Sequence, residues 1–542
     1  MFKIFLVACC VALVLALATG CGAENRFTSP SGMPDILFSQ PQLPDVYLYD
    51  DGYDDYASQY DSYVALIQVE APGNIAEARP LRLSMRNPLT LNPLTNQDVT
   101  VDRVLGLIFE PLIVLDDTFQ PTSHLAEIEF ASDFQSVMVV IRSDAFWADG
   151  MPVTSDDLIF TVDTLRAGAA DSIYYNNVQN IASIHRINSR SVEIQFIHPS
   201  PPASAVLGFP VVPRHHYQGQ AQETSNAMSP LGNGPFLLYS FSPTGGMVLK
   251  PNPTSFRPRP GVDTVEVVFL PDDTSDLYAF DQGRIDAINL PLTTWASHHS
   301  VRHPNYQIIP AMYFEFIGFN FGRENFNNRQ VRQGIAQAFD ISQVVQTVYL
   351  NHAVRAYSPI HPGSFISSGV EGLAYNPTVA RHLLNAVTFE YPIHIIANRD
   401  NPQRVSIAHQ LATSLTGIGF DAWVEVLDGP DYFWRIDHGH FDLFIGGVQL
   451  EVIPNVEFLF NGQGIFMENL DLMAAFGGLS SFFNMGTYMQ TMAQFETLFA
   501  RELPVVSLAF RHSAVLTNGR ITQNVPPALD SIFAFVNMWE VE

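Results

Sequence analysis

The sequence predicts an α/β protein with two or three lobes, and three observations lead to that prediction. The chain has 542 residues, of which 47% are hydrophobic, so it is too long for one ordinary domain and can fill more than one core. From about residue 313 onward, amphipathic helix patterns alternate with short strand patterns, as in parallel βαβ units. Between residues 136 and 166, a turn at 149–150 separates a strand pattern from a capped helix pattern.

The first twenty residues have the pattern of a signal peptide. Lys3 precedes an apolar run from Ile4 to Ala18, which is shorter than the roughly 20 residues of a membrane-spanning helix. The run ends in L-A-T-G-C, which resembles a bacterial lipobox, so we predict cleavage before Cys21 and lipidation of that cysteine. An ordinary signal peptide followed by an unrelated cysteine is the alternative. Because the other two cysteines lie inside the apolar run, the mature chain would have no disulfide and no cysteine metal site.

Residues 21–79 have no sustained apolar period. Between Leu43 and Tyr63 they become a run of tyrosines and aspartates. We interpret 21–79 as a solvated tether between the lipid anchor and the folded body. An acidic, aromatic docking segment for a partner is a second interpretation. A bound calcium ion is a third, although the run lacks the ligand spacing of a calcium loop.

The folded body begins near Leu81, where apolar and polar residues alternate as in a half-buried strand. The D-G pair at 149–150 predicts a turn, and Thr154 with Asp157 three residues later predicts a capping box. A helix pattern follows, in which apolar residues at i, i+4 and i+7 form one stripe that we expect to be buried. Further strand patterns occur at 137–141, 192–197, 206–212, 247–250 and 265–270.

The C-terminal half contains the longest series of alternating elements. Asp340 is placed to cap a helix. Beyond it we expect strands at 392–397, 420–427 and 442–448, a helix at 431–437, and a helix that carries Ile407, Leu411, Leu415 and Ile418 on one face. We expect these strands to pair in parallel.

Two stretches carry a resemblance to one protein family. Residues 147–161, W-A-D-G-M-P-V-T-S-D-D-L-I-F-T, resemble the signature W-x-D-G-x-P-x-T-x-D-D-h-x-F-T, in which h is apolar. Residues 327–340 resemble N-x-x-V-R-x-A-h-x-x-A-h-D. Shorter similarities occur at 90–93, 107–112, 209–216, 232–236, 283–286 and 503–508. Over roughly residues 80–542 the chain thus resembles the bacterial extracellular solute-binding proteins of family 5, the oligopeptide- and dipeptide-binding lipoproteins of ABC transporters.

The resemblance implies a two-lobed α/β fold like that of the type II periplasmic binding proteins, with an extra small α+β lobe inserted in the first lobe. Strands near Tyr313 to Asn320 would join the lobes and act as a hinge. The implied division is a signal peptide at 1–20, a tether at 21–79, lobe I at 80–106, 226–312 and 509–542, lobe II at 107–225, and lobe III at 313–508.

The resemblance also implies ligand-binding residues in the cleft between the lobes. In oligopeptide-binding relatives, the strand matching residues 441–447 runs into W-x-x-D-Y-x-x-P, whose aspartate holds the peptide's α-ammonium group. Here the same place reads V-Q-L-E-V-I-P, so Glu451 would supply the carboxylate and Gln449 an amide contact. A glutamate on a surface turn, or a ligand without a free amino terminus, is the alternative. Asn320 and Glu110 are further candidates; an ordinary strand-end asparagine and a turn carboxylate are their alternatives.

No catalytic constellation is visible in the sequence. It contains no G-x-S-x-G, H-E-x-x-H, C-x-x-C or G-x-G-x-x-G pattern. Histidines at 215–216 and at 438 and 440 suggest a metal, but close neighbours in sequence seldom bind one ion without further ligands, so we expect no metal and no cofactor. Four tryptophans can either stack on a ligand or belong to the core: Trp147, Trp295, Trp423 and Trp434.

The formal charge of −27 argues against nucleic-acid binding and against electrostatic attraction to anionic lipid. We predict a lipid-anchored, monomeric solute-binding component of an ABC importer on the outer face of the bacterial cytoplasmic membrane. It would contact the membrane only through its lipid, capture an oligopeptide or another small solute, and deliver it to permease subunits. The alternatives are a binding lipoprotein that serves signalling or adhesion and, less favoured, a hydrolase built on the same lobes.

Overall fold

The computed structural model describes most of the chain from residue 80 onward. The described residues are 36–37, 80–116, 118–168, 172–200, 205–219, 225–290, 305–452, 469–479, 484–523, 536 and 539–541. The predicted signal peptide, Cys21, Trp295 and all of the tether except β1 (Ile36–Leu37) lie outside them. The folded body belongs to one compact unit, Leu37–Glu542. None of the helices in these described ranges has both the length and the apolar character needed to cross a membrane.

The first sheet combines strands from both sides of a long inserted segment. Its neighbouring strands include β9 (Phe236–Ser242), β10 (Gly246–Pro251), β11 (Val265–Phe269) and β2 (Leu81–Met85), in that order. The helices of this part are α2 (Val99–Leu105) and α5 (Asp273–Asp281). In β2, buried residues alternate with half-buried ones, as predicted. β2 pairs in parallel with β11, whereas β10 is antiparallel to both of its neighbours.

The inserted segment forms a second sheet, which is fully antiparallel. Its strands lie in the order β5 (Ala126–Phe130), β6 (Ser136–Ile141), β8 (Ser191–Phe196) and β7 (Ile181–Arg186). The same segment contains a hairpin of β3 (Ile113–Leu115) and β4 (Pro121–Ser123), and helices α3 (Ser155–Gly168) and α4 (Arg214–Tyr217). The strand predicted at 206–212 is wrong: a 3-10 turn covers 205–207, and Pro210 forms only an isolated bridge. Its apolar residues are buried without pairing in a sheet.

Helix α3 begins after Thr154, as predicted, but only half of the predicted capping box forms, because the Asp157 backbone N–H donates to the Thr154 carbonyl oxygen at 3.1 Å and not to its hydroxyl. The Asp157 carboxylate accepts hydrogen bonds from the backbone N–H and the hydroxyl of Thr154, at 2.8 and 2.9 Å. The predicted stripe of α3, residues 158, 162 and 165, is fully buried. The local sequence therefore sets both the start of this helix and the face that it buries.

One hydrophobic core serves the first two sheets together. Val267 of β11, Val139 of β6 and Leu158 of α3 all belong to the same cluster of buried side chains. Trp147 and Trp539, which come from distant parts of the chain, are also members. The inserted segment thus shares its core with the segments on either side of it, and the lobe limits given above stay a prediction.

The third sheet has seven strands. In spatial order they are β12 (Ala287–Leu290), β18 (Val505–Thr517), β13 (Asn305–Phe319), β17 (Leu443–Gln449), β15 (Ile393–Asn398) and β16 (Ala422–Leu427), and β14 (Ala353–Arg355) also pairs with β18. β15 is parallel to both β16 and β17, as the alternating pattern predicts. The helices of this part are α7 (Glu324–Asn327), α8 (Arg329–Ala338), α9 (Ile341–Thr347), α10 (Pro377–Leu384), α11 (Pro402–Gly417), α12 (Gly429–Asp437), α13 (Leu470–Gly478) and α14 (Met485–Glu502).

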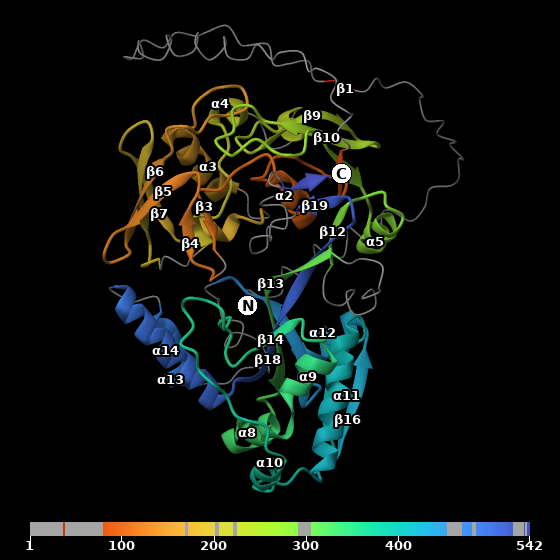
Figure 1. Ribbon diagram of the computed structural model, residues 1–542. Helices are drawn as coiled ribbons and strands as arrows, with labels where there is room; N and C mark the ends of the chain where they lie inside the picture. Colours follow the sequence, from red (N-terminus) through yellow and green to blue (C-terminus); the bar gives the residue numbers. More distant parts are fainter. Residues whose placement is uncertain are drawn as a thin grey trace, which may run out of the picture. The chain divides into compact units, whose positions relative to one another are not determined.

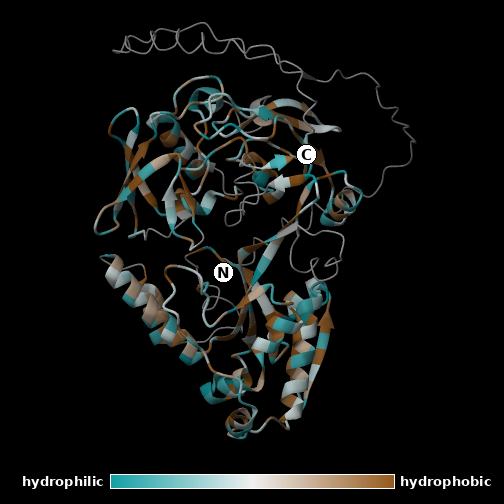
Figure 2. Ribbon diagram, viewed as in Figure 1, coloured by the Kyte–Doolittle hydropathy of each residue, from teal (hydrophilic) through white to brown (hydrophobic). Residues whose placement is uncertain are grey.

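The third sheet contributes to two separate cores. Ile317 of β13 and Ile445 of β17 join helices α8 and α11 in a mainly aliphatic cluster, which we call the aliphatic core. Phe314 of β13 and Phe444 of β17 join α14 in an aromatic cluster. Because successive side chains of a strand point to opposite faces, one strand can serve both cores. Figure 2 shows hydrophobic colour along β16 beside the mixed colours of α11.

Strands β13 and β18 pair beyond the end of β17 (Figure 1). They connect the core shared by the first two sheets with the cores of the third sheet. Ile309 of β13 and Val515 of β18 belong to the core shared by the first two sheets, whereas Ile317 belongs to the aliphatic core. The pairing of β13 with β18 shifts register after Pro310 and again after Glu315. Such shifts bend a strand pair locally. The hinge that we predict from sequence stays a prediction.

Candidate functional site

The family-like signature at 147–161 has a structural role, because its side chains connect neighbouring segments. Besides capping α3, the Asp157 carboxylate accepts hydrogen bonds from the Trp147 indole N–H at 3.3 Å and from the Arg214 backbone N–H at 2.8 Å. Burial raises the pKa of the Asp157 carboxyl, although these hydrogen bonds oppose the rise. The signature therefore fastens α3 to the start of α4.

The histidine pairs are engaged in separate contacts. His215 Nε2 lies 2.7 Å from Asp149 Oδ2, whereas His216 Nε2 lies 2.8 Å from a backbone carbonyl oxygen. His438 stacks on Trp434, with ring centroids 4.4 Å apart. Within the part of the chain that the structure describes, no group of three or more His, Cys, Asp or Glu is arranged to hold a metal ion.

The parallel strands of the third sheet end at one edge, which we call the carboxyl edge. β15 ends at Asn398, β16 at Leu427 and β17 at Gln449. In open α/β sheets, ligands bind outside the carboxyl ends of parallel strands. Helix α11 starts at this edge, where the Asn401 side chain accepts a hydrogen bond from the Arg404 backbone N–H. The positive end of the α11 dipole therefore lies there as well.

Three strands place a row of polar side chains at the carboxyl edge. The register pairs Gln449 of β17 with Tyr313 of β13, and Tyr313 in turn with Arg511 of β18. Residues that lie directly opposite each other in antiparallel strands share a face of the sheet. Tyr313 and Arg511 do share a face, because the Arg511 guanidinium carbon lies over the Tyr313 ring, 4.6 Å from its centre.

Glu451 extends this row on the same face. Leu450 and Val452 are buried in the aromatic core on the other face of the sheet, so alternation along the chain directs Gln449 and Glu451 to the face of Tyr313. Glu451 is exposed to solvent. Nearby protein still excludes part of its water, and this desolvation raises the pKa of its carboxyl.

The Glu315 carboxylate anchors two arginines beside the row. Arg404 Nε and Nη2 donate to its two oxygens at 2.8 and 3.0 Å, and Arg511 Nε lies 2.8 Å from Oε1. Glu315 is 1% exposed. Gly447 lies opposite Glu315 and leaves room for this triad, because a Cβ there would lie 2.3 Å from Arg404 Nη2. One carboxylate and two guanidinium groups leave one net positive charge.

Asn320 lies away from the carboxyl edge. It directly follows the C-terminal end of β13. Asn320 and Tyr313 are seven residues apart, which at about 3.3 Å per residue is about 23 Å along the strand. The Asn320 side-chain amide donates to the carbonyl oxygens of Gly439 and Phe441, at 2.9 and 2.7 Å. The structure therefore does not bring Asn320 together with Gln449, and the contacts of its amide are those of a strand-end asparagine.

Glu110 is also separate from this edge. It is 2% exposed, and its carboxylate bonds to His124 Nε2 and lies 3.3 Å from Arg257 Nη1. Its backbone N–H donates to the side chain of Asn233 at 3.0 Å. Glu110 therefore joins parts of the core that the first two sheets share.

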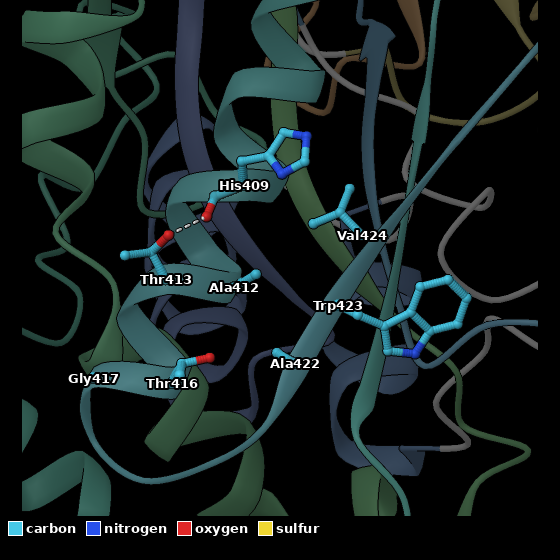
Figure 3. Close-up of a pocket in the computed structure, with 8 residues that line it drawn as sticks. All are labelled: His409, Ala412, Thr413, Thr416, Gly417, Ala422, Trp423 and Val424. Carbon is cyan, nitrogen blue, oxygen red and sulfur yellow. Dashed lines mark hydrogen bonds between the residues drawn. The ribbon is translucent and has the colours of Figure 1, made fainter.

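A shallow groove lies between α11 and β16 (Figure 3). His409 and Trp423 lie at its sides, and the Thr413 hydroxyl donates to the His409 carbonyl oxygen at 2.8 Å. Trp423 stands at the start of β16, so the groove lies away from the carboxyl edge. Its other lining residues are Ala412, Thr416, Gly417, Ala422 and Val424.

Sequence reasoning proposed Glu451 and Gln449 as candidates but did not place Tyr313, Arg404 and Arg511 beside them. These three come from segments far apart in the chain, and only strand register and a helix start bring them together. The predicted class of fold could have pointed to this edge. Once parallel strands are predicted, the residues just after their carboxyl ends are candidates for ligand binding.

The comparisons with known proteins agree with this fold. Residues 120–464 match the model of the bacterial extracellular solute-binding proteins, family 5 Middle. A putative ABC transporter peptide-binding protein of Brucella ovis is 25% identical over 341 residues, which cover 60% of this chain and 64% of the relative. The oligopeptide-binding protein AppA of Bacillus subtilis is 20% identical over 409 residues, which cover 70% of this chain and 75% of the relative. The chain thus matches just under two thirds of the length of the Brucella relative.

Solved structures show the same architecture. The substrate-binding protein CtaP of Listeria monocytogenes has a TM-score of 0.75 at 16% identity, over 86% of this chain and 99% of that chain. NikZ of Campylobacter jejuni has a TM-score of 0.66 at 19% identity, over 85% of this chain and 99% of that chain. The expected two-lobed α/β fold is confirmed. Because the family model matches more than half of its residues, the chain belongs to the bacterial extracellular solute-binding proteins of family 5.

Proposed function

We propose that this chain is the solute-binding component of an ABC importer and that it captures a short peptide or a similar solute at the carboxyl edge. The main support is the row of Glu451, Gln449, Tyr313 and Arg511 on one face, where β13 and β18 leave the sheet. A carboxylate, an amide, an aromatic ring and a guanidinium suit the charged ends and the backbone of a peptide. The Brucella relative is named as an ABC transporter peptide-binding protein, which supports delivery to permease subunits.

The solute class is the first point to test. Among solved relatives, AppA of Bacillus subtilis holds a nonapeptide, whereas NikZ holds Ni(L-His) and NikA of Brucella suis holds Fe(III)-EDTA. Mass spectrometry of the solute that co-purifies with the full chain separates these classes. A peptide supports the proposal, and a metal chelate as the sole solute contradicts the peptide assignment.

Within this function, we propose that the Glu451 carboxylate binds the ammonium group of the ligand. A partly desolvated ion pair of this kind costs about 2–5 kcal/mol when one partner is removed. Glu451→Gln should therefore weaken binding of peptides with a free amino terminus at least tenfold and leave N-acetylated peptides unaffected, as measured by calorimetry. Because the raised pKa makes the carboxylate take up a proton at a higher pH than an ordinary glutamate, binding should weaken as the pH falls through that value.

The matched control for this test is Glu324→Gln. Glu324 is an exposed glutamate at the start of α7, which follows the end of β13 opposite to Tyr313. It makes the same chemical change away from the carboxyl edge, so its variant should bind both peptide forms like the wild type. Equal affinity of Glu451→Gln and wild type for the free-amino peptide would remove Glu451 from the site.

We also propose a lipid anchor at Cys21, which lies outside the described residues and is supported by the sequence L-A-T-G-C. The diacylglyceryl group expected there supplies two chains, which hold a protein at a membrane far better than one. Cys21→Ser should release the protein from the outer face of the cytoplasmic membrane into the soluble fraction of the producing bacterium. A variant that still sediments with membranes after its signal peptide has been removed would show that the anchor is elsewhere.

A further inference from the structure

We infer that Arg511 binds a carboxylate of the ligand and that the ligand is a zwitterion of two or three residues, held between Arg511 and Glu451. This inference rests on the proposed peptide-binding function. It assigns a role to an arginine in the strand pair that connects the cores, and it limits the length of the solute.

The contacts of Arg511 leave one end of its guanidinium available. Its Nε lies 2.8 Å from Glu315 Oε1 in an ion pair, and its guanidinium carbon lies 4.6 Å from the centre of the Tyr313 ring. These two contacts hold the group in place, and its side chain is 12% exposed. Neither Nη atom donates a hydrogen bond to any residue that the structure describes. A fixed arginine with two parallel donors unused is suited to bidentate binding of a carboxylate.

The local charge also favours an anion. Arg404 already donates two hydrogen bonds to Glu315, so the charge of Arg511 is in excess. The neighbouring histidine and tyrosine do not change this balance at neutral pH. Burial lowers the pKa of His512 to about 4, and burial raises the pKa of Tyr349 well above its usual value, so both side chains are uncharged.

Sheet geometry gives the span between the two charged residues. Glu451 and Arg511 lie two strands apart and are offset by two residues, which places their Cα atoms about 12 Å apart for strands spaced about 4.8 Å with a rise of about 3.3 Å per residue. If both side chains stand perpendicular to the sheet, their charged groups are also about 12 Å apart, and two charge-assisted hydrogen bonds of about 2.8 Å then leave about 6 Å for the ligand. This equals about two extended residues, and modest spreading of the long side chains admits a third.

The test is calorimetry of the purified full chain with dialanine, trialanine, tetraalanine and the C-terminal amide of dialanine. Wild type should bind dialanine at least tenfold more tightly than its amide, and should bind tetraalanine at least tenfold more weakly than dialanine or trialanine. Arg511→Gln should lose at least tenfold in affinity for dialanine and stay within twofold of wild type for the amide. Arg511→Lys keeps the positive charge but not the two parallel N–H donors, so its affinity for dialanine should lie between those of wild type and Arg511→Gln.

Arg323→Gln is the matched control. Arg323 is exposed, lies near Asp442 at 3.7 Å, and follows the end of β13 opposite to the carboxyl edge. This variant should bind all four probes like the wild type. Retained affinity for the amide shows that Arg511→Gln is folded; if that variant does not fold, the ratio of acid to amide affinity in Arg511→Lys decides instead.

Three outcomes would overturn the inference in different ways. Equal wild-type affinity for dialanine and its amide, or an unchanged ratio in Arg511→Gln, removes Arg511 as the carboxylate partner. Equal affinity for all three lengths removes the length limit. If wild type binds none of the peptides, the proposed peptide function fails; succinate and glutarate then probe Arg511 without a peptide, and absence of binding to both overturns the carboxylate site as well.

Discussion

One buried histidine, His361, and one half-buried histidine, His512, make the stability of this fold depend on pH. Burial lowers the pKa of His361 and of His512 to about 4, and the charge of a neighbouring histidine adds to each effect. His361 lies between the rings of Phe119 and Phe510, with centroids 4.7 and 4.9 Å away. An imidazole whose pKa is lowered by folding binds its proton more readily when unfolded. Its contribution to the free energy of unfolding is therefore complete above pH 6.5 and is lost as the pH falls towards 4.

We predict that the free energy of unfolding decreases between pH 6.5 and pH 4, by as much as about 3 kcal/mol for each histidine at about 1.4 kcal/mol per pH unit. Urea denaturation at pH 7.5, 6.5, 5.5 and 4.5 measures this slope. His361→Gln should reduce the slope by about half, because one of two groups is removed. His438→Gln, on the exposed surface, should keep the wild-type slope. A free energy that is constant across this window would contradict the prediction.

At the scale of elements, the sequence predicted what is local and missed what depends on distant pairing. The alternation between residues 392 and 448 predicted β15, α11, β16, α12 and β17 to within a few residues at most ends, because each element has its own periodicity. The length and pairing of β13 and β18 carry no such signal, since their partners lie far apart in the chain. The apolar run at 206–212 was mistaken for a strand because burial alone does not imply pairing.

Strand β17 must carry glycine opposite the Glu315–Arg404–Arg511 triad. A Cβ at Gly447 would lie 2.3 Å from Arg404 Nη2 and 2.7 Å from Glu315 Cδ, so the triad would have to move. We expect Gly447→Ala to lower the free energy of unfolding by about 1–3 kcal/mol, as overpacking does, and to weaken dialanine binding because Arg511 moves with Glu315. Denaturant unfolding and calorimetry of the same sample measure both effects.

Gly417→Ala is the control for this prediction. Gly417 is the last residue of α11, and a Cβ there would meet nothing within 4 Å. Alanine is the better helix former, so this variant should be as stable as wild type or more so, by up to about 1 kcal/mol. Equal stability of the two alanine variants would show that the triad tolerates a side chain at Gly447.

At the scale of the whole molecule, the inserted segment also reaches the aromatic core of the third sheet. The tip of the β3–β4 hairpin contains Phe119, which is 1% exposed, has a left-handed backbone with φ of 64°, and belongs to the aromatic core together with Phe510. Beside it, the Phe365 backbone N–H donates to the Thr118 carbonyl oxygen at 3.0 Å. The inserted segment is therefore held to the third sheet at a second place, besides the core that it shares with the first sheet.

This contact and the strands β13 and β18 together should set how compact the protein is. Two lobes that close on a ligand should give a smaller radius of gyration in X-ray scattering once the co-purifying solute is bound. Phe119→Ala removes a buried ring, which typically costs about 3–5 kcal/mol, and so should release the hairpin. The unliganded variant should have a larger radius than unliganded wild type, because β13 and β18 alone would then restrain the inserted segment relative to the third sheet.

The solute should bring the Phe119→Ala variant back towards the liganded wild-type radius, since the carboxyl edge is intact in it. Phe433→Ala provides the control: Phe433 is 61% exposed on α12, so the loss of its ring should change neither radius. A wild-type radius that is the same with and without bound solute would count against hinge closure. A Phe119→Ala radius equal to that of wild type would show instead that the strand pair alone fixes the arrangement, because the hairpin contact would then contribute nothing to it.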